Sequence, residues 1–150
     1  MKKAKKILAI CIGCTGSGKS YYCQHTLHNY YHISQDNFGK KHYKKFLELL
    51  LNDEKLICVD RMNFSVEQRL RYVLPAKQFG YKISYYLFTC PYHICIKRMQ
   101  QRKNHPTVNQ NDHKKHRELL SFFENNYEKP QDWEFHELNE VKTGEINEKR

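Results

Sequence analysis

The sequence predicts an α/β fold in which a five-stranded parallel sheet is covered by helices on both faces. Short apolar runs alternate with segments of helical length along the chain, and a glycine-rich loop directly follows the first run. The 150 residues suffice for one domain with a single core. We expect that domain over residues 1–138, followed by a charged, disordered tail over residues 139–150.

The individual elements follow from the same pattern. Five apolar runs are expected to form strands, at 7–12, 30–34, 56–60, 82–88 and 133–138. Segments of helical length and period lie between them, at 19–29, 40–52, 65–79, 91–103 and 113–127. Strictly alternating strands and helices favour parallel strand pairing, because each helix carries the chain back to the same end of the sheet.

Three residues punctuate the helix expected over 65–79. Ser65 suits the N-terminal cap, and Gly80 suits the stop before the next strand. Pro75 should kink or shorten the helix near its end, because proline lacks the backbone N–H that continues the hydrogen-bond ladder.

The charge balance favours a polyanionic partner. Lysine and arginine number 26 against 16 aspartate and glutamate residues, a formal net charge of +10. A positive surface of this kind raises the local concentration of nucleic acid, although surplus lysines are also compatible with a merely solvated surface.

Cysteine usage and hydropathy point to an intracellular protein. The cysteines mostly lie in or beside apolar runs, as reduced cytosolic cysteines do: Cys11, Cys14, Cys23, Cys58, Cys90 and Cys95. The opening MKKAKKILAICIGC has the basic head of a secretory leader, but its apolar run is far too short to span a bilayer. We expect a cytoplasmic or nuclear protein with no membrane segment.

The stretch GCTGSGKS fits the phosphate-binding pattern G-x-x-x-x-G-K-[ST]. Its glycines let backbone N–H groups approach phosphate oxygens, and it opens a helix whose dipole favours negative charge. Lys19 supplies a mobile positive charge for the outer phosphates, and the Ser20 hydroxyl can ligate Mg²⁺. The residues expected to hold the nucleotide are Gly13, Cys14, Thr15, Gly16, Ser17, Gly18, Lys19 and Ser20.

Two cysteines of this segment allow a competing interpretation. Cys11 and Cys14 form a C-x-x-C pair, for which Cys90, His93 and Cys95 are the nearest further metal ligands by spacing. This interpretation is disfavoured because Cys11 lies within a strand and Cys14 inside the phosphate loop.

Two aspartates follow expected strands and should reach the same edge of the sheet. Asp60 ends the run LICVD, where a carboxylate can enter the Mg²⁺ shell of a phosphate loop. Asp36 follows the second strand and could accept a hydroxyl proton during phosphoryl transfer. Spacing alone equally allows Asp36 to serve a turn with Asn37 and Gly39.

Arg98 and Arg102 lie four residues apart on the helix after the fourth strand, so both project from one face. Beside a nucleotide, such guanidinium groups would neutralise charge on the transferring group. A solvated basic helix face, shared with Lys97 and Lys103, explains the pattern equally well.

Taken together, the segments resemble the polynucleotide 5′-hydroxyl kinases of the phage type and the kinase domains of tRNA ligases. The resemblance covers residues 5–130 and rests on GCTGSGKS, YYHISQDNF, ICVDRMNFSVEQR, AKQFGYKISYYLF and CPYHICIKRMQQRKNHPT in that order and spacing. It implies a P-loop kinase-like fold with a helical lid.

The resemblance also implies roles for particular residues. Lys19 and Ser20 would hold the donor phosphates and Mg²⁺, Asp60 would serve the metal or phosphate site, and Asp36 would be the general base. Arg98 and Arg102 would belong to the lid that clamps the donor phosphates, continued by residues 103–107.

The acceptor site departs from the family pattern. Phage-type kinases carry an arginine three residues after the base, where this sequence has Gly39. The residues expected to contact the acceptor besides Asp36 are Lys40, Lys41, Arg61 and Asn63. Of the basic residues among them, only Arg61 can bind a phosphate in bidentate fashion.

The activity implied is transfer of the γ-phosphate of ATP or GTP, with Mg²⁺, to the 5′-hydroxyl end of RNA or DNA. The sequence has neither a D-x-D pair of a phosphatase nor a K-x-D-G motif of a ligase. A ligase or phosphatase on a separate chain would therefore complete any end-healing pathway.

Three other activities remain as alternatives. A small-molecule kinase on the same fold would have a closed acceptor pocket and no salt-sensitive oligonucleotide binding. A non-catalytic RNA-binding module would bind oligonucleotide without transferring phosphate. A cyclic phosphodiesterase would use two H-x-[ST] triplets, at His32 and His105, but Pro106 argues against the strand that the second triplet needs.

Overall fold

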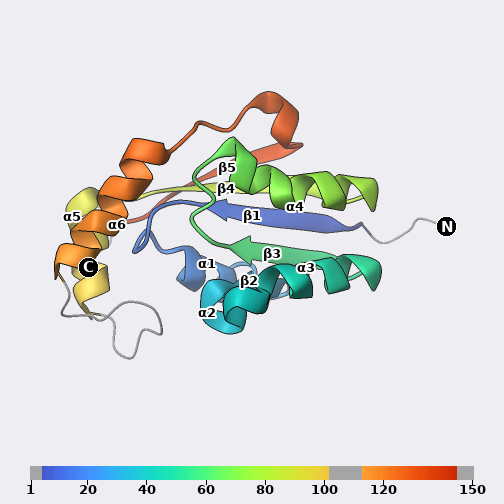
Figure 1. Ribbon diagram of the computed structural model, residues 1–150, viewed down its shortest axis with the longest axis horizontal. Helices are drawn as coiled ribbons and strands as arrows, with labels where there is room; N and C mark the ends of the chain where they lie inside the picture. The colour runs from blue at the N-terminus through green and yellow to red at the C-terminus, as the bar shows by residue number, and fades with distance from the viewer. Residues whose placement is uncertain (1–4, 102–112, 145–150) are drawn as a thin grey trace.

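A computed structural model describes residues 5–101 and 113–144, which form an α/β fold around one parallel sheet (Figure 1). The five strands lie in the order β2-β3-β1-β4-β5, and every pairing is parallel. The strands are β1 Ile7–Ile12, β2 Tyr31–Ser34, β3 Leu56–Asp60, β4 Lys82–Thr89 and β5 Glu137–Lys142. The fold class predicted from the sequence is confirmed.

The helices are α1 Lys19–His25, α2 Gln35–Phe38, α3 His42–Leu51, α4 Val66–Gln78, α5 Tyr92–Gln101 and α6 His113–Asn126. Short 3₁₀ turns occur at Gly39–Lys41 and Asp132–Glu134. Within the described residues, no helix is both long and apolar enough to cross a membrane.

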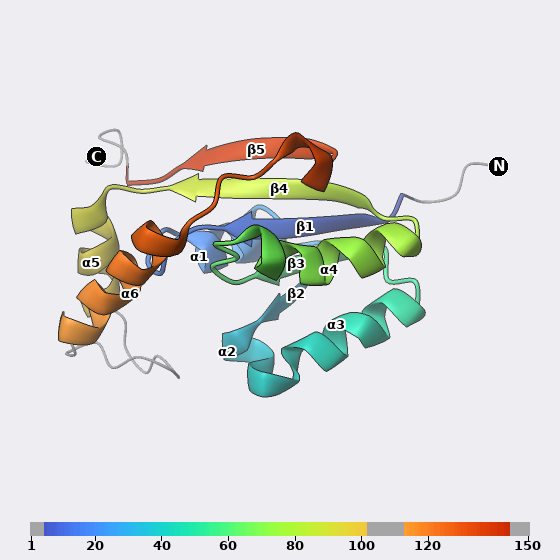
Figure 2. The ribbon, with the colours of Figure 1, turned by 45° about the horizontal axis from the view of Figure 1, so that its top comes forward.

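Helices cover both faces of the sheet. Figure 2 shows α3 and α4 on one side, where they pack on a core formed by alternate residues of β1, among them Leu8, Ile10 and Ile12. The intervening residues Ala9 and Cys11 face α1 on the other side. Because these residues are small, α1 can approach the sheet closely.

Helices α5 and α6 pack against each other beyond the carboxyl ends of the strands (Figure 1). Cys95 and Met99 of α5 and Leu120 of α6 form their shared core. This is the end of a parallel sheet at which ligands bind in open α/β folds.

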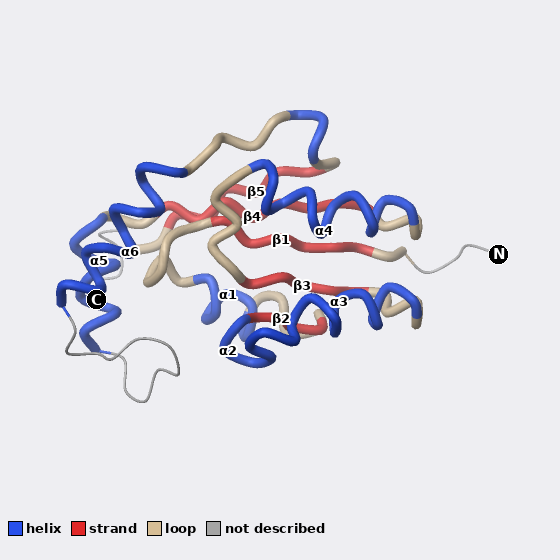
Figure 3. Tube along the Cα trace, in the orientation of Figure 1, coloured by secondary structure: helices blue, strands red, loops and turns tan. Residues whose placement is uncertain are grey.

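The strand register brings the expected site segments to that same edge. Asp60 of β3 lies opposite Cys11 of β1 and opposite Ser34 of β2. The phosphate loop therefore leaves β1, and α2 leaves β2, on either side of Asp60. Figure 3 shows the loops that follow β1 and β3 emerging at this edge.

The fifth strand lies further along the chain than predicted. Residues 132–134 form a 3₁₀ turn, and β5 covers Glu137–Lys142 rather than 133–138. The apolar character of WEFHEL suggested a strand, but Glu134 is fully buried and serves another purpose. Residues 139–144 are consequently part of the domain and not of a tail; residues 145–150 lie outside the described part of the chain.

The third predicted helix is not interrupted at Pro75. Helix α4 continues to Gln78, with Ser65 as its N-terminal cap and Gly80 after its end, as expected. Pro75 cannot donate to the carbonyl of Arg71, four residues earlier, and the Tyr43 hydroxyl donates to that oxygen instead at 2.9 Å. The lost hydrogen bond is thus replaced from α3.

A buried ion pair fixes the turn before β5. Arg69 of α4 donates through Nε to Glu134 Oε1 at 2.8 Å, and both side chains are fully buried. Two backbone carbonyls, of Asn63 and Glu128, accept from the other guanidinium nitrogens. The Tyr85 hydroxyl donates to the same carboxylate at 3.0 Å. Each of the three guanidinium nitrogens of Arg69 therefore has an acceptor, as burial of a charge requires.

Replacing Glu134 by Gln should lower the free energy of unfolding by about 3 kcal/mol, because Arg69 would remain buried without a counter-charge. Glu137→Gln provides the matched control, since its pair with Lys82 is exposed and worth less than about 1 kcal/mol. Urea denaturation measures both. Equal, small losses for the two variants would contradict the structural role of the buried pair.

Candidate functional site

The phosphate loop joins β1 to α1 in a backbone conformation that needs glycine. Gly16 and Gly18 have φ values of +84° and +99°, in the left-handed region. A Cβ atom on Gly16 would lie 2.6 Å from the Cys95 carbonyl oxygen, and one on Gly18 would lie 3.3 Å from Arg98 Nη1. The loop is therefore packed tightly beneath α5, which leaves no room for a side chain at Gly16, and the positive φ strains any other residue at Gly18.

Two polar side chains of the loop fit the requirements of a bound phosphate. The Lys19 ammonium donates to the carbonyl oxygens of Gly13 and Cys14 at 2.8 and 2.7 Å, so it lies over the loop. Ser17 Oγ is buried, and no described residue hydrogen-bonds to it. A buried hydroxyl without a partner is costly unless a ligand or water supplies one.

One carboxylate oxygen connects α1 to the sheet. Asp60 Oδ2 accepts hydrogen bonds from Ser20 Oγ at 2.7 Å and from His32 Nε2 at 2.8 Å. A serine hydroxyl and a carboxylate are hard oxygen donors of the kind that bind Mg²⁺ beside a nucleotide. The two residues predicted to hold the metal, Ser20 and Asp60, therefore do lie together.

The imidazole of His32 is charged in this environment. Burial alone would lower its pKa, but hydrogen bonds to Asp60 and Cys23 and the charges of these groups outweigh that effect and raise the pKa to about 10. Sequence reasoning treated His32 only as part of an H-x-[ST] triplet. The other triplet, with His105 and Thr107, lies outside the described residues.

Asp36 lies in the short helix α2, directly after β2. The helix starts where Ser34 Oγ accepts from the Asn37 backbone N–H at 3.0 Å. The backbone of Asp36 thus stands at the carboxyl edge of the sheet, two residues beyond the partner of Asp60. The role of Asp36 as general base stays a prediction.

Arg98 holds the phosphate loop from the side of α5. Its Nη1 donates to the carbonyl oxygen of Gly16 and to Thr143 Oγ1, both at 3.2 Å. Thr143 Oγ1 in turn donates to the Ser17 carbonyl at 2.7 Å. Sequence reasoning assigned Thr143 to the tail, and no local signal marks it. Arg102 and residues 103–107 lie outside the described part of the chain.

The residues predicted to contact the acceptor separate into three groups. Lys40 and Lys41 lie exposed on the 3₁₀ turn before α3. Asn63 is buried, and its amide donates to the Cys11 carbonyl at 2.8 Å, so it links the loop after β3 to β1. Arg61 lines a pocket beside the phosphate loop.

That pocket has a volume of about 50 Å³, enough for a group of several atoms. It is lined by Arg61, Met62, Asn63, Gln68, Arg71 and Tyr72. The Met62 carbonyl accepts from the Gly13 backbone N–H at 3.1 Å. Residues 61–63 therefore line the pocket and also hydrogen-bond to the phosphate loop.

Arg61 is oriented by a buried polar network. Its Nη1 lies 3.0 Å from His42 Nε2 and 3.2 Å from the Tyr72 hydroxyl. Burial and the Arg61 charge lower the pKa of His42, which favours the neutral imidazole. His42 Nδ1 lies 3.1 Å from the Gly39 carbonyl oxygen, which links the network to the position where phage-type kinases have arginine.

The C-x-x-C pair does not act as a unit. Cys14 Sγ lies 3.5 Å from Cys95 Sγ, whereas Cys11 points to the opposite side and approaches Cys23 and Cys58. The hydrogen bond with Cys95 and the nearby Lys19 ammonium outweigh burial and lower the pKa of Cys14 to about 7. The grouping of Cys11 with Cys23 and Cys58 was not anticipated from the sequence.

Comparison with known proteins identifies the family of the chain. The family AAA_33, described as AAA domain, matches residues 39–126. A curated relative, "Transcription factor bHLH140" of Arabidopsis thaliana, is 32% identical over 114 residues, which are 69% of this chain. The chain spans only 12% of that relative's length.

Solved structures share the fold. A sugar kinase from Janibacter sp. HTCC2649 has a TM-score of 0.67 at 11% identity, with 95% of this chain and 88% of that chain covered. The APS kinase CysC of Mycobacterium tuberculosis, in complex with AMPPNP and APS, has a TM-score of 0.60 at 15% identity, with 95% and 91% covered. These likenesses establish a P-loop kinase-like fold.

Replacing Gly16 by Ala should weaken nucleotide binding at least about 10-fold, because the new methyl group meets a backbone oxygen and the positive φ is strained. Gly39→Ala is the matched control. Gly39 also has a positive φ, of +55°, but nothing lies within 4 Å of its added Cβ.

Gly39→Ala should therefore lose about 1 kcal/mol of stability and keep its nucleotide affinity. Titration with a fluorescent ATP analogue, alongside thermal unfolding, measures both effects. Unchanged affinity in a folded Gly16→Ala variant would contradict the phosphate-loop assignment.

Proposed function

Since the chain belongs to the AAA_33 family and has a P-loop kinase-like fold, we propose that it transfers the γ-phosphate of ATP or GTP to the 5′-hydroxyl end of RNA or DNA. The observation that carries the proposal is an arginine-lined pocket beside the phosphate loop. Met62 lines this pocket, and its carbonyl accepts the hydrogen bond from the Gly13 backbone N–H of the loop. A donor phosphate on the loop and an acceptor phosphate in this pocket would therefore adjoin each other.

The donor half consists of the phosphate loop, Lys19 and the Ser20–Asp60 pair. The Lys19 ammonium, which donates to the carbonyls of Gly13 and Cys14, would donate to phosphate oxygens when a nucleotide binds. Mg²⁺ held by Ser20 and Asp60 would neutralise charge on the phosphates. Arg98, fixed by Gly16 and Thr143, adds positive charge on the opposite side of the loop.

The acceptor half is formed by Arg61 and the pocket beside it. Arg61 and Arg71 both line this pocket, and a planar guanidinium group is suited to bidentate recognition of phosphate. In a polynucleotide, the phosphate nearest the 5′ end lies close to the reacting hydroxyl. The two arginines that line the pocket would suit that anionic group.

Asp36 would complete the site as general base. The 5′-oxygen attacks the γ-phosphorus in line, its proton passes to the Asp36 carboxylate, and the bond from phosphorus to the bridging oxygen breaks. The net charge of +10 attracts a polyanionic acceptor more than a small neutral one. A separate ligase or phosphatase would act on the ends before or after this step.

A small-molecule kinase is the second candidate, favoured by the fold that the chain shares with a sugar kinase and an APS kinase. The two candidates differ in salt dependence, because only a polynucleotide acceptor releases condensed counterions on binding. Acceptor affinity should fall steeply with salt for an oligonucleotide and only slightly for a small molecule.

The protein, incubated with Mg²⁺ and γ-labelled ATP or GTP, should label 5′-hydroxyl RNA or DNA oligonucleotides and leave 5′-phosphorylated ones unlabelled. Asp36→Asn should lower the transfer rate by about 10²- to 10⁴-fold while nucleotide affinity stays near that of the unaltered protein. Absence of label on every oligonucleotide tested would refute the proposed function.

Arg61→Ala should raise KM for the oligonucleotide by roughly 10-fold or more, because a charge-assisted pair with a phosphate is lost. Lys55→Ala serves as control, since it removes one positive charge at the opposite edge of the sheet, before β3 begins. Equal effects of the two variants would show that Arg61 acts only through net charge.

A further inference from the structure

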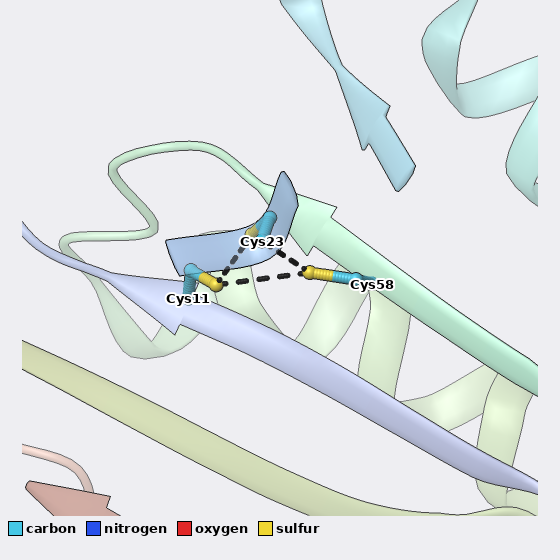
Figure 4. Close-up of side chains that lie close together, drawn as sticks. All are labelled: Cys11, Cys23 and Cys58. Carbon is cyan, nitrogen blue, oxygen red and sulfur yellow. Dashed lines mark hydrogen bonds between the residues drawn. The ribbon is translucent and has the colours of Figure 1, made fainter. Parts of the chain in front are cut away.

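Three cysteine thiols meet beneath the phosphate loop, between β1, β3 and α1 (Figure 4). Cys11 Sγ lies 3.4 Å from Cys23 Sγ and 3.8 Å from Cys58 Sγ, and the last two sulfurs are 3.1 Å apart. Cys11 and Cys58 are fully buried, and Cys23 is 2% exposed. No step of the proposed transfer uses these thiols.

The strand register assembles this cluster. Cys58 of β3 lies opposite Ala9 of β1, so Cys11, two residues further on, is its diagonal neighbour on the same face. His32 of β2 lies directly opposite Cys58. Cys23 comes from α1, three residues after Ser20 and on the same side of the helix. The three thiols thus face one another, and the ligand atom of His32 lies within 4.8 Å of the Cys23 sulfur.

We propose that Cys11, Cys23, Cys58 and His32 bind a structural Zn²⁺ ion. The ligand atoms of the three cysteines lie within 4.8 Å of one another, and those of Cys23, His32 and Asp60 also do. Three cysteines and one histidine are a ligand set typical of structural zinc sites.

The distances fit the ion after a small adjustment. With Zn–S bonds of about 2.3 Å, a regular tetrahedron separates its sulfurs by about 3.8 Å. The Cys11–Cys58 pair already has this separation, and the other two pairs would open by less than about 1 Å. The Cys23 side chain, at the end of a seven-residue helix, can supply this movement by itself.

His32 is oriented by a carboxylate as zinc-ligating histidines usually are. Its Nε2 already bonds to Asp60 Oδ2, which leaves Nδ1 for the ion. Zinc binding would displace the thiol protons of the three cysteines and the second imidazole proton.

The proposed ion would stabilise the donor half of the site. It would fix α1 through Cys23 and orient Asp60 through His32. Helix α1 and Asp60 are also joined by the hydrogen bond from Ser20 Oγ to Asp60 Oδ2. This zinc site does not depend on the proposed transfer activity, because its ligands form a separate cluster and its test measures metal alone.

The test uses the full chain, reduced and freed of metal, titrated with Co²⁺ as a spectroscopic probe for zinc. We expect one equivalent to bind with sulfur-to-cobalt charge-transfer absorption and the strong visible bands of a tetrahedral site, and Zn²⁺ to abolish both. Protein purified without chelators should carry one zinc per chain by elemental analysis. Absence of the charge-transfer absorption, or a Cys11–Cys23 disulfide in place of metal, would overturn the proposal.

Variants locate the ion within the chain. Cys23→Ser and His32→Gln should each weaken Co²⁺ binding at least about 10-fold, and His32→Gln should also alter the visible bands. Cys90→Ala is the matched control, since Cys90 lies outside the cluster and should leave cobalt binding unchanged. Circular dichroism checks that each variant folds. Equal cobalt affinity in folded Cys23→Ser and Cys90→Ala variants would refute the assigned ligands.

Discussion

The Asp60 carboxylate holds together the elements on which the site depends. One oxygen, Oδ2, accepts from Ser20 at the start of α1 and from His32 on β2, while Asp60 itself ends strand β3, which lies between β2 and β1. Asp60 is only 6% exposed, and a buried carboxylate needs hydrogen-bond donors. Ser20 and His32 supply them. Three elements that are distant in sequence are thereby fixed within a few ångströms of the phosphate loop.

The remainder of the site extends from this point in two directions. On one side, Arg98 donates a hydrogen bond to the Gly16 carbonyl and Thr143 donates one to the Ser17 carbonyl. Helix α5 and the residue after β5 therefore contact the loop. On the other, Met62 joins the loop to the pocket that contains Arg61. Donor and acceptor contacts therefore rest on one backbone framework, and a shift of the loop would alter both.

Much of this arrangement follows from local sequence. The apolar runs ILAICI and LICVD predict the strands β1 and β3, and GCTGSGKS predicts the turn between β1 and α1. Long-range pairing determines the rest. Glu134 resembles a strand residue until Arg69, 65 positions earlier, is seen beside it, and the polar edge strand β5 has little apolar signal. The Cys11–Cys23–Cys58 cluster likewise exists only once β1, β3 and α1 are in register.

The most direct test of the central role of Asp60 is the Mg²⁺ dependence of nucleotide affinity in Asp60→Asn. Asparagine can still accept from Ser20 and His32, but it lacks the charge that holds the cation. Mg²⁺ should tighten ATP binding to the unaltered protein at least about 10-fold, equivalent to about 1.4 kcal/mol, and have almost no effect on the variant. The same tightening in both proteins would contradict this account.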